Sequence, residues 1–164
     1  MTGGLEVEEV LDLDLRLLRT PAGAPLDPSA HRAALERSLP RSRHAAVRRG
    51  GALVAYAYLW PLEESGAWFA GGLAIAPGHR SAPVIRELRD TVANLLRAEG
   101  VRVLHSHVRT GNAASLRLHR RLGFREVRRS DEAVACVLDV TGPTFQNGAR
   151  RAIRAPADAG GSRP

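Results

Sequence analysis

The segment from Val108 to Phe124 constrains the fold of this chain more than any other part of it. It reads Val-Arg-Thr-Gly-Asn-Ala-Ala-Ser-Leu-Arg-Leu-His-Arg-Arg-Leu-Gly-Phe, which is typical of a strand end, a turn, a helix beginning at Asn112 and a Gly-Phe stop. At about 100° per residue, Asn112, Ser115 and His119 fall on one stripe of that helix. Leucines flank the stripe and arginines lie opposite, so the helix presents polar groups to whatever lies against its buried edge.

The spacing of these residues resembles the second signature of the GNAT superfamily of acyl-CoA-dependent N-acyltransferases. That signature has a Val, an Asn four residues later, and then Ala or Ser, Tyr and Gly-Phe at three, seven and eleven residues beyond the Asn. The corresponding residues here are Val108, Asn112, Ser115, His119, Gly123 and Phe124, so only the Tyr differs. The resemblance implies an α/β fold, with an α+β mixed sheet in which two central parallel strands splay apart and admit acyl-CoA.

The order of apolar patterns along the rest of the chain fits such a mixed sheet, with helices on both faces. Alternation predicts strands over 10–18, 44–48, 52–60, 68–76, 102–108, 124–128 and 133–140. Helical spacing and capping residues predict helices over 29–39, 81–99 and 112–122. We expect one domain over residues 1–140 and a disordered tail over 141–164, because the tail is rich in Gly, Pro, Ala and Arg.

The resemblance assigns the splayed pair to Trp68–Ala76 and Arg102–Val108. The pair Gly71-Gly72 could host the bulge that parts the two strands, or could only let a neighbouring chain approach closely. Both alternatives remain open at the level of sequence.

Composition excludes several classes of chemistry. The chain has 164 residues and a formal net charge of +7, and all 24 of its basic residues are Arg. Without Lys there is no Schiff-base or phosphate-loop lysine. The one cysteine, Cys136, sits in an apolar alternating stretch and is expected to be a buried, inert thiol. No apolar run is long enough to span a membrane and no signal peptide is evident, so we expect no membrane and a cytoplasmic location.

The family's first signature follows the fourth strand, where acyl-CoA phosphates meet the N-terminus of a helix. Here that region reads Ile-Ala-Pro-Gly-His-Arg-Ser-Ala-Pro-Val-Ile, from Ile75 to Ile85. Pro83 and Ile85 replace the two usual glycines, which removes one N–H donor and adds a branched side chain. The resemblance implies acyl-CoA contacts at Leu73, Ile75, Arg80, Ser81, Ala82, Val84, Ile85, Arg86, Asn112 and Ser115.

Two histidines are candidate catalytic residues. His119 stands where the family has a Tyr that is thought to protonate the departing thiolate, and it could instead be a satisfied histidine at the edge of the core. His107 stands where ribosomal-protein N-terminal acetyltransferases, a branch of the family, have a Glu base, and it could instead be an ordinary strand histidine. Alternation also puts His105 on the same face as His107, but no third ligand is convincingly spaced, so no metal is expected.

The first hypothesis is therefore an N-acetyltransferase that moves an acetyl or short acyl group from acyl-CoA to a primary amine. Attack would be direct, in a ternary complex, with acetyl-CoA as donor and an unidentified amine as acceptor. One alternative is a GNAT fold without catalysis that binds acyl-CoA or a protein partner. Another is a basic nucleic-acid-binding protein, but only Phe124 is interleaved with the arginines of 117–129, which argues against base stacking. A homodimer is left open.

Overall fold

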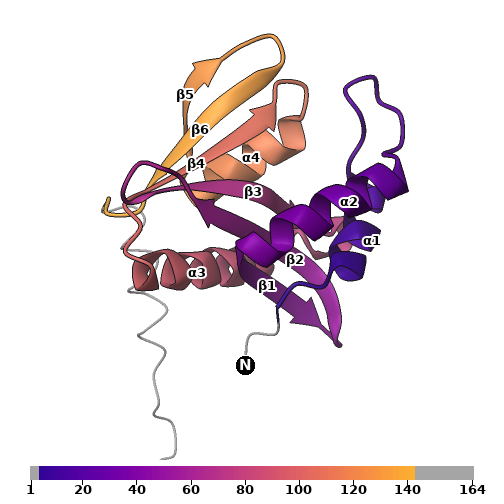
Figure 1. Ribbon diagram of the computed structural model, residues 1–164, viewed down its shortest axis with the longest axis horizontal. Helices are drawn as coiled ribbons and strands as arrows, with labels where there is room; N and C mark the ends of the chain where they lie inside the picture. The colour runs from indigo at the N-terminus through magenta and orange to yellow at the C-terminus, as the bar shows by residue number, and fades with distance from the viewer. Residues whose placement is uncertain (1–3, 143–164) are drawn as a thin grey trace, which may run out of the picture.

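The computed structural model describes residues 4–142, and a six-stranded mixed sheet forms its centre (Figure 1). The strands lie in the order β1-β2-β3-β4-β6-β5. Only β3 and β4 pair in parallel, and the other neighbours are antiparallel. The bounds are β1 (Arg43–Arg49), β2 (Ala52–Pro61), β3 (Ala67–Ile75), β4 (Val103–Arg109), β5 (Arg125–Arg129) and β6 (Ala133–Asp139). Beyond Gly142, the tail expected over 141–164 lies outside the described residues.

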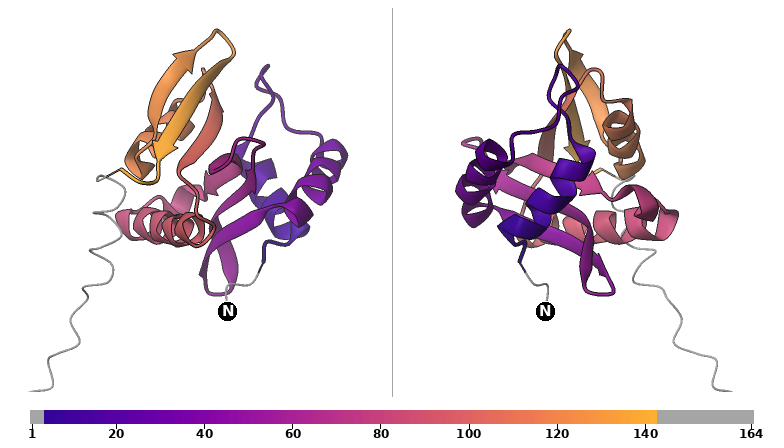
Figure 2. Two further views of the ribbon diagram at one scale, coloured as in Figure 1. Left: turned by 60° about the vertical axis from the view of Figure 1, so that its left-hand side comes forward. Right: turned by 90° about the vertical axis from the view of Figure 1, so that its right-hand side faces the viewer.

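Helices cover both faces of this sheet (Figure 2). On one face, α1 (Val7–Leu17) and α2 (Pro28–Ser38) pack on β2 through a core that includes Leu13, Leu35 and Tyr56. The other face carries α3 (Ala82–Ala98) and α4 (Ala113–Leu122), whose buried leucines join a second core. Two short 3-10 helices, η1 (Leu39–Arg41) and η2 (Pro77–His79), complete the elements. No helix among these residues has the length and apolar character needed to cross a bilayer.

Most elements expected from the sequence are present with shifts of one or two residues at their ends, but the first is different. Residues 10–18 were expected as a strand, and the structure has helix α1 there. The prediction was wrong because Leu11, Leu13, Leu15 and Leu17 alternate, which fits a strand, while the buried residues Val10, Leu11, Leu13 and Asp14 also share one helical face. Glu8 and Glu9 in the first turn and Arg16 in the last turn complement the helix dipole, which favours the helix.

The two central parallel strands part soon after they meet. Pairing between β3 and β4 covers only Ala67 with Val103, Trp68 with Leu104 and Phe69 with His105. From Ala70 to Ile75, β3 keeps its pairing to β2 but has none to β4. The splayed strands expected from the resemblance are therefore present, and they leave the β4-facing edge of β3 without a strand partner.

The pair Gly71-Gly72 lies at the start of this gap and fits both alternatives left open above. Tyr58 pairs with Gly72 while Leu59 pairs with Ala70, so Gly71 is the extra residue of a bulge. The two glycines also allow close approach, because a Cβ on Gly71 would lie 1.9 Å from the Trp60 ring and one on Gly72 would lie 2.2 Å from the Tyr58 ring. The glycines bend the strand and make room for these two rings.

Candidate active site

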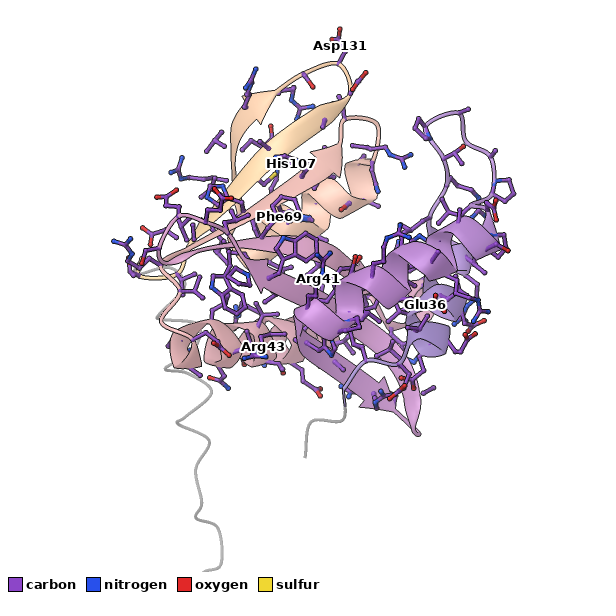
Figure 3. The ribbon with its side chains drawn as sticks, in the orientation of Figure 1. Glu36, Arg41, Arg43, Phe69, His107 and Asp131 are labelled. Carbon is purple, nitrogen blue, oxygen red and sulfur yellow. The ribbon has the colours of Figure 1, made fainter. Side chains whose placement is uncertain are left out.

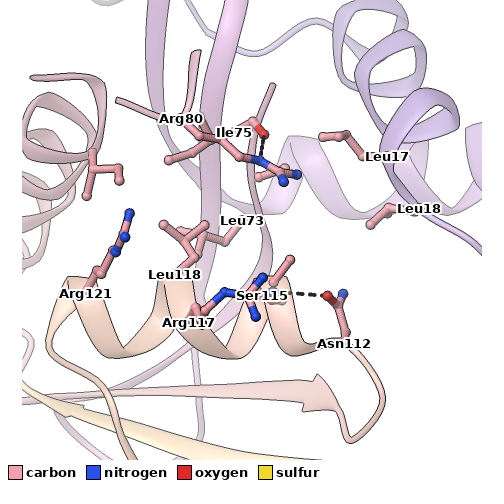
Figure 4. Close-up of a pocket in the computed structure, with 13 residues that line it drawn as sticks. Leu17, Leu18, Leu73, Ile75, Arg80, Asn112, Ser115, Arg117, Leu118 and Arg121 are labelled. Carbon is pink, nitrogen blue, oxygen red and sulfur yellow. Dashed lines mark hydrogen bonds between the residues drawn. The ribbon is translucent and has the colours of Figure 1, made fainter. Parts of the chain in front are cut away.

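A cleft lies at the open end of the gap, between the end of β3, the start of α3, one side of α4 and the end of α1 (Figure 4). Its walls combine apolar side chains such as Leu73 and Leu118 with three arginines, Arg80, Arg117 and Arg121. We call it the arginine cleft. It is lined by Leu17, Leu18, Leu73, Ala74, Ile75, Arg80, Ile85, Asn112, Ala114, Ser115, Arg117, Leu118 and Arg121.

The N-terminus of α3 lies at this cleft and keeps anion-binding capacity despite Pro83. In the first turn, the amide of Ile85 donates to the carbonyl of Ser81. Ala82 and Val84 precede the first residue that can bond within the helix, so their N–H groups have no intrahelical acceptor. The side chain of Ser81 makes no capping hydrogen bond, and the Pro83 side chain is exposed. The proline therefore removes one donor but its ring does not fill the turn.

Six of the ten residues expected to contact acyl-CoA line the arginine cleft: Leu73, Ile75, Arg80, Ile85, Asn112 and Ser115. The other four do not. Ser81, Ala82 and Arg86 are exposed outside its lining, and the Val84 side chain is buried in the core. Sequence reasoning missed Arg117 and Arg121, which were assigned to the solvent side of α4. The two arginines are four residues apart, so they lie on the same side of α4, and this spacing could have predicted that they line one surface together.

Arg80 and Asn112 are each held in place by a backbone contact. The Nε–H of Arg80 donates to the carbonyl of Ile75 at 3.3 Å, which leaves its two terminal nitrogens directed at the cleft (Figure 4). Asn112 caps α4, because its side-chain oxygen accepts from the amide of Ser115 at 3.0 Å. Both contacts fix charged or polar groups on the cleft wall.

His119 is buried between α4 and β4, with 3% of its surface exposed. Its Nδ1 lies 2.8 Å from the carbonyl oxygen of Ser115, which can only accept, so Nδ1 carries the hydrogen. Its Nε2 then accepts from the hydroxyl of Ser106 at 2.8 Å. Burial lowers the pKa of His119, and the contact with the Ser115 backbone only partly offsets this. A neutral imidazole with both nitrogens occupied favours the packing alternative over proton donation.

His107 is exposed on β4, and Figure 3 shows it near Phe69 of β3. Its ring meets the ring of Phe69 edge to face, with centroids 5.3 Å apart. His105 lies on the same face of β4, and Leu104, Ser106 and Val108 lie on the buried face, as the alternation predicted. The Phe69 contact holds the His107 ring at the point where β3 and β4 separate.

A second cleft contains His107 and adjoins the arginine cleft, with which it shares Leu18, Leu73, Asn112 and Ser115. We call it the tyrosine cleft. It is lined by Asp14, Leu18, His31, Tyr56, Tyr58, Ala70, Gly71, Gly72, Leu73, Ser106, His107, Val108, Arg109, Asn112, Ser115 and His119. Asp14, His31 and Tyr58 were not predicted as site residues. They come from α1, α2 and β2, and their meeting is a product of the tertiary fold.

Within residues 4–142, no group of three or more His, Cys, Asp or Glu side chains is arranged to hold a metal ion. His105 and His107 thus have no third ligand among the described residues. Cys136 is buried on β6, and burial raises the pKa of its thiol. A thiol in that environment is a poor nucleophile.

The gap, the two adjoining clefts and the helix N-terminus agree with a comparison against protein families. The sequence model of the acetyltransferase (GNAT) family matches residues 8–124. The chain belongs to this family. GNAT enzymes are acyl-CoA-dependent N-acetyltransferases. This general activity therefore applies to the chain, and its acceptor is treated below. A comparison with curated proteins gives no match at the level of sequence.

Solved structures show the same fold at low sequence identity. The ribosomal-protein-S18-alanine N-acetyltransferase of Escherichia coli has a TM-score of 0.63 and 20% identity, covering 85% of this chain and 93% of that one. A ribosomal-protein-alanine N-acetyltransferase of Brucella melitensis has a TM-score of 0.60 and 21% identity, covering 81% and 93%. A Bacillus subtilis acetyltransferase solved in complex with CoA has a TM-score of 0.61 and 15% identity, covering 84% and 95%.

Proposed function

We propose that this GNAT protein transfers an acetyl or short acyl group from acyl-CoA to a primary amine, by direct attack in a ternary complex. The observation that carries the proposal is that the two clefts adjoin at the gap between β3 and β4, where they share Leu73, Asn112 and Ser115. One cleft has the arginines and apolar walls suited to a nucleotide and its pantetheine arm, and the other has polar groups suited to an amine. A donor and an acceptor can therefore occupy the protein together.

In this proposal the arginine cleft holds the donor. Arg80, Arg117 and Arg121 supply positive charge for phosphates, together with the free N–H groups at the start of α3. Leu73 and Leu118 supply apolar surface for the pantetheine arm. Acyl-CoA contributes a thioester, whose C–S bond breaks as the new C–N bond forms and whose sulfur leaves as a thiolate that takes up a proton.

Two groups of the chain assist this exchange. Backbone N–H groups of β3 near Leu73 and Ile75 face a gap without a paired strand, so they can stabilise negative charge on the acyl oxygen. His107 accepts a proton from the amine nitrogen, directly or through water. We assign no proton transfer to His119, since its two ring nitrogens are committed to Ser106 and Ser115. With Cys136 buried, we expect no covalent enzyme intermediate.

Two measurements test the proposal. Acetyl-CoA at a hundred times its Kd should raise the unfolding free energy by about 2.7 kcal/mol, seen as a rise in melting temperature. Release of CoA thiol should then increase when primary amines are added. Absence of any thermal shift up to millimolar acetyl-CoA would count against the proposal. A thermal shift without amine-dependent thiol release would show that the protein binds acetyl-CoA but does not transfer its acetyl group to the amines tested.

The remaining sequence predictions are extensions of this proposal. We assign the acyltransferase to residues 1–140 as one domain. The cytoplasmic location stays a prediction, and the question of a homodimer stays open. Acyl-chain length is open to the same thiol-release assay, with propionyl-CoA and butyryl-CoA in place of acetyl-CoA.

A further inference from the structure

The floor of the tyrosine cleft contains a buried carboxylate that the proposed transfer does not use. Asp14, in the middle of α1, has 1% of its surface exposed. Its Oδ1 accepts from the hydroxyl of Tyr56 at 2.5 Å, and its Oδ2 lies 2.8 Å from Nε2 of His31. Burial raises the pKa of Asp14, and the hydrogen bonds from Tyr56 and His31 act against that rise. Burial of a carboxylate can cost stability even when the group is hydrogen-bonded.

Two polar atoms on residues near Asp14 have no hydrogen-bond partner within residues 4–142, and both residues line the cleft. Tyr58 is 9% exposed, and its hydroxyl has no hydrogen bond within residues 4–142. Because no fully buried side-chain oxygen among the described residues lacks a partner, this hydroxyl is not fully buried, and Tyr58 lines the cleft. Burial and the nearby Asp14 raise the pKa of Tyr58 to about 12, so the phenol stays protonated at neutral pH.

The second such atom is Nδ1 of His31. Its ring is fixed through Nε2, which faces the Asp14 carboxylate, and Nδ1 has no partner in the described part of the chain. When Nε2 carries the hydrogen, Nδ1 is an acceptor. The hydroxyl of Tyr58 can also accept, so the floor offers two acceptors near the Asp14 carboxyl group.

The charges around this floor favour a cation. Asp14 is the only carboxylate lining the tyrosine cleft among the described residues. Within residues 4–142, Arg109 is the only arginine on that lining. It is exposed and donates to the carbonyl of Arg19 at 2.9 Å, so water screens its charge at the rim. His107 and His119 lie toward β4 and α4. The ring of Tyr58 lies under Gly72, which places this floor next to the gap where transfer would occur.

We propose that this floor binds a second ammonium group of the acceptor, so that the preferred substrates are diamines whose other amine is acylated at the gap. The inference rests on the proposed function and names its substrate class. The second ammonium donates hydrogen bonds to Tyr58 and His31, with Asp14 behind them. The aromatic side chains of β2 contact the methylene chain.

The test compares diamines with monoamines of matched length, from diaminopropane to diaminohexane against propylamine to hexylamine. In the wild type, kcat/KM for the best diamine should exceed that of its matched monoamine by about ten- to a hundredfold. This ratio should fall close to one in Asp14→Asn and in Tyr58→Phe. Because the ratio is measured within one protein, partial loss of folded enzyme does not change it.

The variants are chosen to keep the fold. Asn at position 14 still accepts from the Tyr56 hydroxyl but lacks the charge, and Tyr58→Phe removes a hydroxyl that has no partner. Asp12→Asn is the matched control, since Asp12 lies on the same helix but is exposed and pairs with Arg16. That control should keep the wild-type ratio.

Calorimetric titration of diaminobutane separates this inference from the proposed function. If no amine is acetylated but diaminobutane binds the wild type and not Tyr58→Phe, the site stands and the proposed transfer fails. A wild type that transfers equally well to both amine series overturns the inference and leaves the transfer intact. A diamine preference that survives both Asp14→Asn and Tyr58→Phe also overturns it.

Discussion

The hydroxyl of Ser106 donates to Nε2 of His119 at 2.8 Å, in a buried contact between β4 and α4. This bond ties the helix that carries Asn112 and Ser115 to the strand that carries His107. With Nδ1 bonded to the carbonyl of Ser115, the contact with Ser106 leaves neither ring nitrogen of His119 free to donate a proton to a substrate. The residue standing at the family's Tyr position thus serves to hold two walls of the site together.

Stability should depend on pH through His119. Because burial lowers its pKa from the ordinary value near 6.5, the unfolded chain binds a proton at pH values where the folded chain does not. The unfolding free energy therefore falls as the pH drops below about 6.5, by up to about 1.4 kcal/mol per pH unit, until the folded-state pKa is reached. Urea unfolding between about pH 5 and 7.5 measures this loss.

The variant His119→Gln provides the comparison. It lacks the imidazole that titrates, so the difference in unfolding free energy between wild type and variant should shrink as the pH falls. A difference that stays constant across the same pH range would contradict the burial of a neutral His119.

Transfer should depend more on His107 than on His119. We expect His107→Ala to lower kcat/KM by about a hundredfold or more, as for loss of a general base. His119→Phe should cost stability but lower kcat/KM much less. Thiol release by the two variants decides this, and equal, negligible losses in both would leave neither histidine with a chemical role.

Gly72, which packs against the Tyr58 ring, should be intolerant of a side chain. In Gly72→Ala the new Cβ would lie 2.2 Å from the Tyr58 ring, so the ring or the strand must move. We expect a loss of about 1–3 kcal/mol in unfolding free energy together with weaker acetyl-CoA binding. Gly78→Ala is the control, since its Cβ would meet nothing within 4 Å. Equal melting temperatures for the two variants would show that the ring contact is not tight.

Two nearby arginines should differ in their effect on acyl-CoA binding. Arg80 lines the arginine cleft and is anchored to Ile75, while Arg86 is exposed outside the lining. Arg80→Gln should weaken acetyl-CoA binding about tenfold, or about 1.4 kcal/mol, and reduce its salt dependence. Arg86→Gln should leave the Kd within about twofold. Titration calorimetry at two salt concentrations measures both, and the reverse order would move the phosphate site along α3.

Local sequence determined much of the fold and one half of the site. The cap at Asn112, the Gly-Phe end of α4 and the periodicity of α3 are set by neighbours in the chain, and each is present in the structure. The prediction of Arg80 and Ser115 as acyl-CoA contacts came from the resemblance to the family signatures, and both residues line the arginine cleft. Local periodicity failed at residues 10–18, because leucines at alternate positions satisfy both a strand and a helix. Packing against β2 and α2 favours the helix, as do the charged residues in its first and last turns.

The other half of the site was decided by tertiary structure. Asp14, His31 and Tyr58 are far apart in sequence and carry no shared motif, and they meet because α1 and α2 pack across β2 beside the bulge at Gly71. The burial that commits His119 to Ser106 likewise depends on how α4 settles on β4. Sequence periodicity records which face of an element is apolar, but which faces meet, and which polar groups then lose water, follows from the packing of the whole sheet.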